Sequence, residues 1–303
     1  YEMTSSLVGS EMCIRDSNLS VNASLTGEYY KHKEIDYWSL FPMMEITYRA
    51  HPSHILQLSV SSDKTYPSYW EMQNTVSYLN GYTEIQGNPD LRPSRLYSAQ
   101  LNYILKNKYI FTLYANYIDN NFNQLPYQSS ERLVLIYKTL NFDYSSKLGL
   151  NVMIPFKAGS VLDSRLTLNG YYDKMKCDNY HDISFNKDNL AFYAELNNTF
   201  NISSKPTIKA EVSGSYITRN IQGPMTISSM YNVDAGLKWI SPNGKAEISL
   251  KVDDMFNSWV PKDLNLQYKT QDLHMRMIPD SRRVSLSFIY KSVSYTHLTL
   301  PTT

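Results

Sequence analysis

The chain has 303 residues, a formal net charge of +1 and only two cysteines, so it lacks both the broad basic field of a nucleic-acid-binding protein and the cysteines for a disulfide framework. Mean hydropathy is −0.41, and no apolar run approaches the roughly 20 residues of a membrane-spanning helix. A membrane β-strand turns only every second residue to lipid, so a barrel remains compatible with these values, and the 26 tyrosines suit a membrane interface or a ligand-binding surface.

The two ends of the chain differ from everything between them. Residues 1–17 and 293–303 show neither alternation nor turn residues, and both resemble translated sequencing adapters. We therefore expect 1–17 to be a disordered artefact that includes Cys13, and 293–303 to be an artefact detached from the fold. One domain, residues 18–292, remains.

From Leu19 onward, apolar residues alternate with polar ones in segments of about 9–13 residues, which is the period of β-strands. One face of these segments carries no charged residue, whereas the intervening positions include Arg165, Glu195 and Lys238. A Lys or Arg that faces lipid near the midplane costs roughly 2–4 kcal/mol, so we expect the uncharged face to contact lipid. The face includes, in successive segments, Leu25, Tyr29, Leu58, Ala99, Leu113, Leu166, Leu196, Val212, Leu237, Leu250 and Leu286.

Alternation alone also fits a β-sandwich with one wet face, and two further features favour a barrel. Aromatic residues stand at the ends of the apolar face, as in the girdles of a membrane barrel. Short turns also alternate with long loops, as in outer-membrane barrels, where the turns are periplasmic and the loops extracellular. The turns are 51–54, 106–108, 155–160, 203–206 and 241–244, and the loops are 31–38, 63–96, 119–131, 174–188, 219–228 and 256–280.

These features predict an all-β fold, an antiparallel transmembrane β-barrel of which about twelve strands are present. The alternation of turns and loops places the C-terminus in the periplasm. The outer membrane of a Gram-negative bacterium is the expected location, with outer-membrane lipid as a partner.

Two segments carry candidate functional or structural residues. Loop 63–96 is rich in aromatic residues, and loop 256–280 adds two more. These rings either hold a small ligand, such as a chelate, glycan or peptide, or pack the loops on each other, and both readings stay open. The candidates are Tyr66, Tyr69, Trp70, Tyr78, Tyr82, Trp259 and Tyr268.

The segment 87–93 reads as a rigid entry into a strand. Gly87 can take a positive φ, and Pro89 and Pro93 fix φ and hold the preceding residues extended. We expect a structural role for this segment and for the acidic pair after the penultimate strand. The structural candidates are Gly87, Asn88, Pro89, Leu91, Pro93, Asp253, Asp254 and Phe256.

No pattern for catalysis, a cofactor or a metal stands out. His51 and His54 flank a turn without a nearby carboxylate, which is a poor metal site. Serine, histidine and aspartate occur, but not in a nucleophile context such as G-x-S-x-G, and a glycine-rich phosphate loop is missing. We therefore expect a protein that is not an enzyme and carries no cofactor or metal.

Several landmarks resemble the C-terminal barrel of a TonB-dependent receptor, and in particular the outer membrane protein beta-barrel family. They are the segments 66–70 and 87–93, Asn141 with Gly149 in one long descending strand, the segment 252–257, and Arg283 at the start of the last strand. The resemblance covers about residues 18–292.

The resemblance implies an energised importer of a scarce ligand, with roughly 22 strands around a plugged lumen. On this view the chain is a partial barrel, and the plug and the segment that contacts the inner-membrane energy-coupling protein are missing from it. The alternative is a passive pore or surface-binding barrel that closes on its own strands. A hydrolase embedded in a barrel is a third, weaker candidate.

Overall fold

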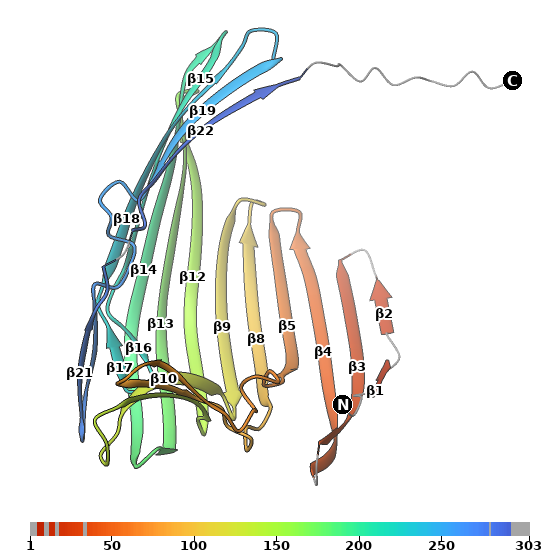
Figure 1. Ribbon diagram of the computed structural model, residues 1–303. Coiled ribbons are helices and arrows are strands. Elements are labelled where there is room, and N and C mark those ends of the chain that lie inside the picture. The colour runs from red at the N-terminus through yellow and green to blue at the C-terminus, as the bar shows by residue number, and fades with distance from the viewer. Residues whose placement is uncertain (1–4, 9–11, 16–17, 33–34, 279, 292–303) are drawn as a thin grey trace, which may run out of the picture.

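The structure is a computed structural model that describes residues 5–8, 12–15, 18–32, 35–278 and 280–291, with side chains described for 18–31, 38–278 and 280–291. The regular elements of this part of the chain are β-strands, arranged in one large curved sheet and two small sheets (Figure 1). No helix among the described residues is long and apolar enough to span a membrane.

The large sheet contains fourteen strands in the order β1-β3-β4-β5-β8-β9-β12-β13-β14-β15-β18-β19-β22, with β2 also paired to β3. Apart from β1 and β2, twelve strands form the wall, which confirms the expected number. They are β3 (Leu19–His32), β4 (Ile35–His51), β5 (His54–Thr65), β8 (Ser94–Leu105), β9 (Tyr109–Asp119), β12 (Tyr144–Ala158), β13 (Leu162–Tyr180), β14 (Ile183–Ser204), β15 (Thr207–Ile217), β18 (Met230–Ile240), β19 (Ala246–Asp253) and β22 (Arg283–Tyr290).

The N-terminal segment contributes two short strands. β1 (Ser5–Val8) and β2 (Met12–Arg15) both pair antiparallel with β3. The expectation that residues 1–17 are disordered is therefore wrong for these two segments. The other residues of 1–17, like the tail 293–303, lie outside the described residues.

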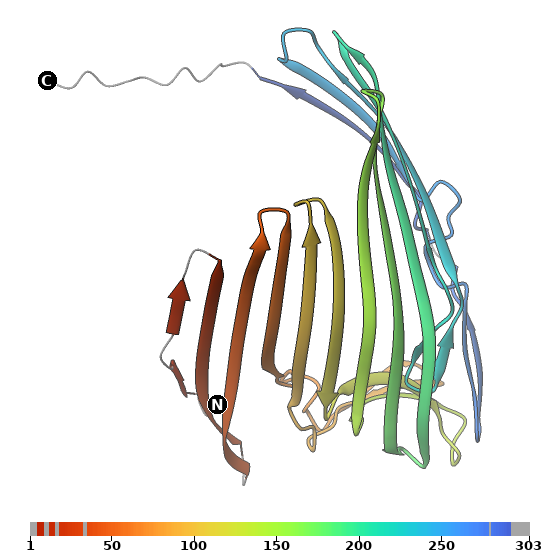
Figure 2. The ribbon, with the colours of Figure 1, turned by 180° about the vertical axis from the view of Figure 1, so that it is seen from behind.

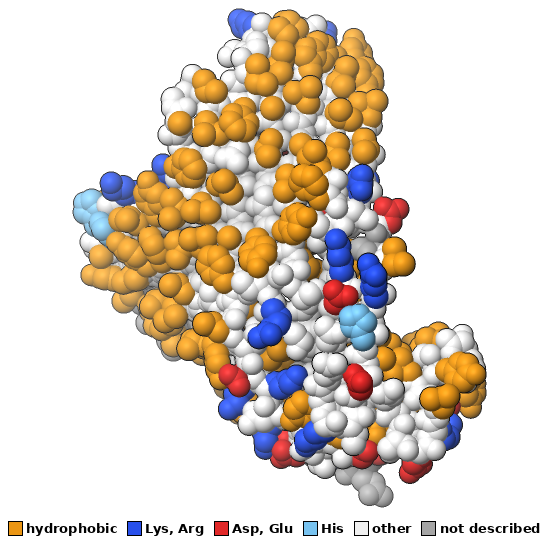
Figure 3. Space-filling model, turned by 90° about the vertical axis from the view of Figure 1, so that its left-hand side faces the viewer, with side chains coloured by type: hydrophobic (Ala, Val, Ile, Leu, Met, Phe, Trp, Pro, Cys, Tyr) orange, Lys and Arg blue, Asp and Glu red, His pale blue; other side chains and the backbone are white. Residues whose placement is uncertain are grey.

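Residues paired directly across antiparallel strands point to the same side of a sheet, so the pairing decides which residues share a face. Leu166 pairs with Leu196, and Leu237 pairs with Leu250, which in turn pairs with Leu286. The uncharged positions therefore form one continuous apolar face, as the alternation predicts. Figure 3 shows hydrophobic side chains over much of one side of the sheet, with charged side chains gathered toward its lower end.

Aromatic rings mark the lower edge of this apolar face. Tyr117 stacks on Tyr144 with ring centroids 5.5 Å apart. On β13, the same face continues past Tyr172 to Lys174, which pairs with Asp188 on β14. The long strands β13 and β14 therefore extend beyond the apolar band into water.

This extension explains two errors in the expected loops. Segments 31–38 and 174–188 were expected to be long loops, but strands enter both from each side. β13 and β14 meet at a tight turn after Tyr180, while β3 ends at His32 and β4 begins at Ile35. Outside the membrane both faces of a hairpin are wet, so charged residues occupy both faces and the alternation that identifies a strand disappears.

The remaining long connections lie at one end of the wall and the short turns at the other, which confirms their alternation. The expected loop 119–131 is longer, however, and runs over 120–143. Asn141 ends a small strand in this connection, whereas Gly149 lies on β12, so the expected single strand through both is wrong. The small strands of the connections are β6 (Val76–Asn80), β7 (Thr83–Gln86), β10 (Phe122–Gln128), β11 (Leu135–Asn141), β16 (Asn220–Gln222), β17 (Met225–Ile227), β20 (Asp263–Tyr268) and β21 (Gln271–Arg276).

Replacing Leu166 by arginine should destabilise the wall, because Leu166 lies in the middle of the apolar face of β13, between Leu162 and Tyr172. We expect the free energy of unfolding to fall by about 2–4 kcal/mol. The matched control is Thr167→Arg on the opposite face, where Thr167 pairs with Glu195; we expect a loss below about 1 kcal/mol there. Urea titration in lipid vesicles measures both, and equal losses would contradict the assignment of the faces.

Candidate functional site

The long connections fold back over the end of the wall as two small sheets. One has the order β10-β11-β7-β6 and the other β16-β17-β20-β21. Figures 1 and 2 both show β10 crossing the end where β13 and β14 turn. We call the connections 66–93, 120–143, 218–229 and 254–282, together with the β13–β14 tip, the loop layer.

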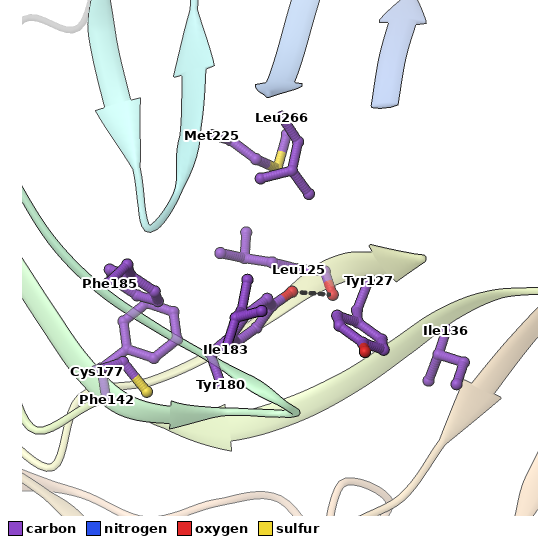
Figure 4. Close-up of a cluster of buried hydrophobic side chains, with 10 residues drawn as sticks. All are labelled: Leu125, Tyr127, Ile136, Phe142, Cys177, Tyr180, Ile183, Phe185, Met225 and Leu266. Carbon is purple, nitrogen blue, oxygen red and sulfur yellow. Dashed lines mark hydrogen bonds between the residues drawn. The ribbon is translucent and has the colours of Figure 1, made fainter. Parts of the chain in front are cut away.

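The loop layer has its own hydrophobic core (Figure 4). Tyr180, from the β13–β14 tip, is fully buried, and its hydroxyl donates to the backbone oxygens of Leu125 and Pro126 at 3.1 and 2.9 Å. Burial of a large apolar side chain contributes about 1.5–3 kcal/mol, so this core holds the layer in one arrangement. Its buried members are Leu125, Tyr127, Ile136, Phe142, Cys177, Tyr180, Ile183, Phe185, Met225 and Leu266.

Sequence reasoning missed this core. Leu125 and Tyr127, two positions apart, were the only local signal for a strand in 122–128. Their partners at Tyr180, Met225 and Leu266 come from connections that are distant in sequence, and no periodicity within one segment indicates such contacts.

The segment 87–93 anchors two connections to each other. The Asn88 side-chain amide donates to the backbone oxygen of Thr139 at 2.9 Å, and the Asn88 N–H donates to Glu71 O at 2.6 Å. Asn141 joins them from the other connection: its amide donates to Arg92 O at 2.8 Å, and its Oδ1 accepts the Arg92 N–H at 2.9 Å. Leu91 is buried beside these contacts, while Pro89 and Pro93 are half-buried.

Gly87 is required for a different reason from the one expected. Its φ is not among the positive values of the chain. A Cβ at this position would instead lie 1.7 Å from the backbone oxygen of Gln73, and the Gly87 N–H donates to Thr75 O at 3.0 Å. Close approach of two backbone segments therefore demands glycine here.

The acidic pair at the end of β19, Asp253 and Asp254, closes the connection 254–282. Asp254 is 3% exposed and has a φ of 44°, and its carboxylate accepts the N–H groups of Ser258 and Trp259 and the hydroxyl of Ser281. Burial favours a raised pKa for Asp254, but these hydrogen bonds outweigh burial and lower the pKa. The carboxylate of the neighbouring Asp253 accepts hydrogen bonds from Nε and Nη2 of Arg283 at 3.0 and 2.8 Å.

The seven candidate aromatic residues lie in several separate places. Tyr66 stacks on Tyr30 of the wall at 4.9 Å, and Tyr69 meets Trp70 edge to face at 5.4 Å. Tyr78 and Tyr82 are 72% and 66% exposed on the β6–β7 hairpin. The remaining two candidates also lie apart: Tyr268 packs against the loop core, and the Trp259 N–H donates to the Asp254 carboxylate. The structural candidate Phe256 has an exposed ring, 6.5 Å from the ring of Tyr231.

One cavity, here called the tip pocket, lies where three hairpin tips of the loop layer meet. Its volume is about 590 Å³. Its apolar lining comes from Tyr82, Leu133, Val134, Leu135 and Leu273, and its polar lining from Gln128, Ser129, Ser130, Arg132 and Thr270. Of the aromatic candidates, only Tyr82 lines the tip pocket.

Two contacts hold the walls of the tip pocket. The guanidinium of Arg132 donates to both carboxylate oxygens of Glu84 at 2.9 and 3.0 Å, and Glu84 is 3% exposed. Hydrogen bonds from Arg132 and then Gln86 lower the pKa of Glu84. On the other side, Gln128 N–H donates to Gln271 Oε1 at 2.6 Å and the Gln271 amide donates to Gln128 O at 3.1 Å, which joins the two small sheets.

The face of the wall opposite the apolar face is polar, and it divides into two parts. On β13–β22 it carries charged residues such as Glu195 and Lys238. On β8, β9 and β12 it carries mainly amides and hydroxyls, together with Lys147 and Lys157 of β12, which are paired with Asp173 and Asp163 of β13. We call the uncharged polar residues of these three strands the amide strip: Ser98, Gln100, Asn102, Thr112, Asn116 and Asn151. Within the amide strip, Ser98 donates to Asn116 at 2.8 Å and Thr112 donates to Asn102 at 2.7 Å.

The described residues contain no group of three or more His, Cys, Asp or Glu that could hold a metal. The rings of His51 and His54 lie 6.0 Å apart at a turn of the opposite end, and Nδ1 of His54 is 2.7 Å from the hydroxyl of Tyr103.

Comparison with known proteins agrees with this architecture. The outer membrane protein beta-barrel family matches residues 14–290. None of the curated proteins matches the chain in sequence. Among solved structures, a mutant of the ferric enterobactin receptor from Pseudomonas aeruginosa is 12% identical, with a TM-score of 0.60, over 95% of this chain and 44% of that chain.

The FrpB iron transporter from Neisseria meningitidis, in its apoprotein form, is similar in the same way. It is 13% identical, with a TM-score of 0.58, over 92% of this chain and 44% of that chain. Identities this low show a shared fold alone. The chain spans less than half the length of either structure.

Proposed function

Because the chain belongs to the outer membrane protein beta-barrel family, we propose that it is the wall and loop layer of an energised outer-membrane receptor that imports a scarce small ligand. The polar face lines the lumen of this receptor, and the apolar face contacts outer-membrane lipid. The loop layer faces the outside of the cell, and the turns and the C-terminus face the periplasm.

One observation carries this proposal over a passive pore. A pore that closes on twelve strands would pair β3 with β22, but these strands stand at opposite ends of the curved sheet (Figure 1). Among the described strands β22 pairs only with β19, so its other edge is unpaired. Such an edge calls for further strands, since barrels leave no edge unpaired.

The similar structures support the same reading. They are about twice as long as this chain over a shared fold, and they are described as a receptor and an iron transporter. We propose that further strands complete a barrel of roughly 22, that a plug domain fills its lumen, and that the plug segment contacts the inner-membrane energy-coupling protein.

Liposome swelling separates the two candidates. The protein from the complete reading frame, reconstituted in vesicles, should not admit raffinose, because a plugged lumen has no open channel. Deletion of the plug should cause swelling at a rate near that of a general porin. Swelling of the complete protein at the porin rate would contradict the proposal and favour the passive pore.

A further inference from the structure

The tip pocket offers no free charge to a ligand. Its one cationic side chain, Arg132, is engaged by both oxygens of Glu84. The Arg132–Glu84 pair has no net charge, so an anion that reached the exposed N–H groups of Arg132 would meet the Glu84 carboxylate beside them, which repels it. Next to the lining in the chain stand two acidic residues, Glu131 and Asp272, and one basic residue, Lys269, whose ammonium donates to the Ser184 hydroxyl at 2.8 Å. The pocket therefore disfavours an anionic ligand.

Apart from Arg132 the lining is uncharged, and it suits a ligand that has both polar and apolar surface. Gln128, Ser129, Ser130 and Thr270 supply amide and hydroxyl groups, which donate and accept hydrogen bonds. Tyr82 and Leu133 supply exposed apolar surface beside them. A sugar ring has the complementary surface, with apolar C–H faces and a rim of hydroxyls.

The amide strip repeats this chemistry below the loop layer. Its strands β8, β9 and β12 are the ones from which the connections 66–93 and 120–143 emerge, and these connections carry Tyr82 and Arg132. The one cation beside the strip on its face, Lys147, is paired with Asp173 at 3.6 Å, and Oδ1 of Asn151 is shielded from solvent without a hydrogen-bond partner in the described part of the chain. An unused acceptor in an uncharged polar strip suits a hydroxyl-bearing ligand.

From these observations we propose that the tip pocket binds a neutral, hydroxyl-rich ligand, an oligosaccharide. This inference rests on the proposed receptor function and adds the class of its ligand. It sets the chain apart from a receptor for a ferric tris-catecholate, whose negative charge requires free Arg or Lys groups.

The test uses the complete protein in detergent, with calorimetric titration of two kinds of probe. The neutral probes are a panel of hexasaccharides that includes maltohexaose, cellohexaose and mannohexaose, and the anionic probe is ferric enterobactin. At least one hexasaccharide should bind, and ferric enterobactin should not bind. Tyr82→Ala should weaken the sugar at least tenfold, because it removes a ring that is exposed in the pocket wall.

The matched control is Met277→Ala, which shortens an exposed apolar side chain of the loop layer outside the pocket lining; it should leave the affinity within twofold. Binding of no hexasaccharide, or equal loss in both variants, overturns the proposal. Binding of ferric enterobactin that Tyr82→Ala abolishes also overturns it. Swelling of the complete protein in raffinose would refute the plugged receptor without bearing on sugar affinity, so the two failures are distinguishable.

Discussion

Gly87→Ala should release the loop layer from its anchor. The added Cβ would lie 1.7 Å from the backbone oxygen of Gln73, and neither backbone segment can move without breaking the hydrogen bond from Gly87 to Thr75 or the bonds of Asn88. We expect the free energy of local opening to fall by on the order of 3 kcal/mol or more, in the range of severe single substitutions. Trypsin cleavage after Arg132 in intact membranes should accelerate roughly 100-fold, because proteolysis follows the open population.

The control for this substitution lies six residues earlier. Gly81 is in the β6–β7 turn, and a Cβ there would meet nothing within 4 Å. Its φ is not among the positive values, so Gly81→Ala should leave the cleavage rate unchanged. If Gly87→Ala also left it unchanged, the close approach of residues 73 and 87 would not be what holds the layer.

Asp254→Asn should open the connection 254–282. The carboxylate accepts the N–H groups of Ser258 and Trp259 and the hydroxyl of Ser281, and hydrogen bonds to a charged group contribute about 1.5–3 kcal/mol each. Asparagine keeps the tolerance for a φ of 44° but loses the charge and one acceptor. We expect a loss of about 2–4 kcal/mol at neutral pH, measured by urea titration in vesicles.

The advantage of the native protein over Asp254→Asn should depend on pH. The pKa of Asp254 is lowered in the folded protein, so its contribution is complete above the unfolded pKa near 3.9 and is lost as pH falls through the lower folded pKa. The difference between the two proteins should therefore be full at pH 7 and should begin to shrink as pH falls below about 4. Asp272→Asn, at an exposed residue with one weak contact at 3.3 Å from Gln267, is the control. A difference that does not shrink between pH 5 and pH 2.5 would show that the charge is not the cause.

The sequence by itself determined the wall. Leu166, Leu196 and Leu237 share the apolar face, and the charged positions Arg165 and Glu195 lie on the other face, as their spacing predicts. A bilayer imposes this pattern on each strand separately, since every second side chain must be free of charge. A constraint that acts within ten consecutive residues can be recognised from those residues alone.

Beyond the apolar band that constraint ends, and the prediction became less accurate there. The outer halves of β13 and β14 carry charge on both faces, so they were expected to be loop, and β11 was expected to continue into β12. The aromatic residues of the loops were recognised as candidates, but their sequence did not indicate that Tyr82 alone lines the tip pocket. Outside the membrane, a strand can form its hydrogen bonds without any alternation of apolar and polar residues, so the spacing of apolar residues does not reveal it.

Only the tertiary structure decided the loop layer. Tyr180 reaches Leu125 and Gln271 reaches Gln128 from connections that are far apart in the chain, and Gly87 is glycine because of an oxygen at Gln73. The motif 87–93 was recognisable, but the reason for its glycine was not a property of the motif. Close packing between separate segments depends on contacts between individual atoms, and the periodicity of a single sequence does not indicate which distant segments make them.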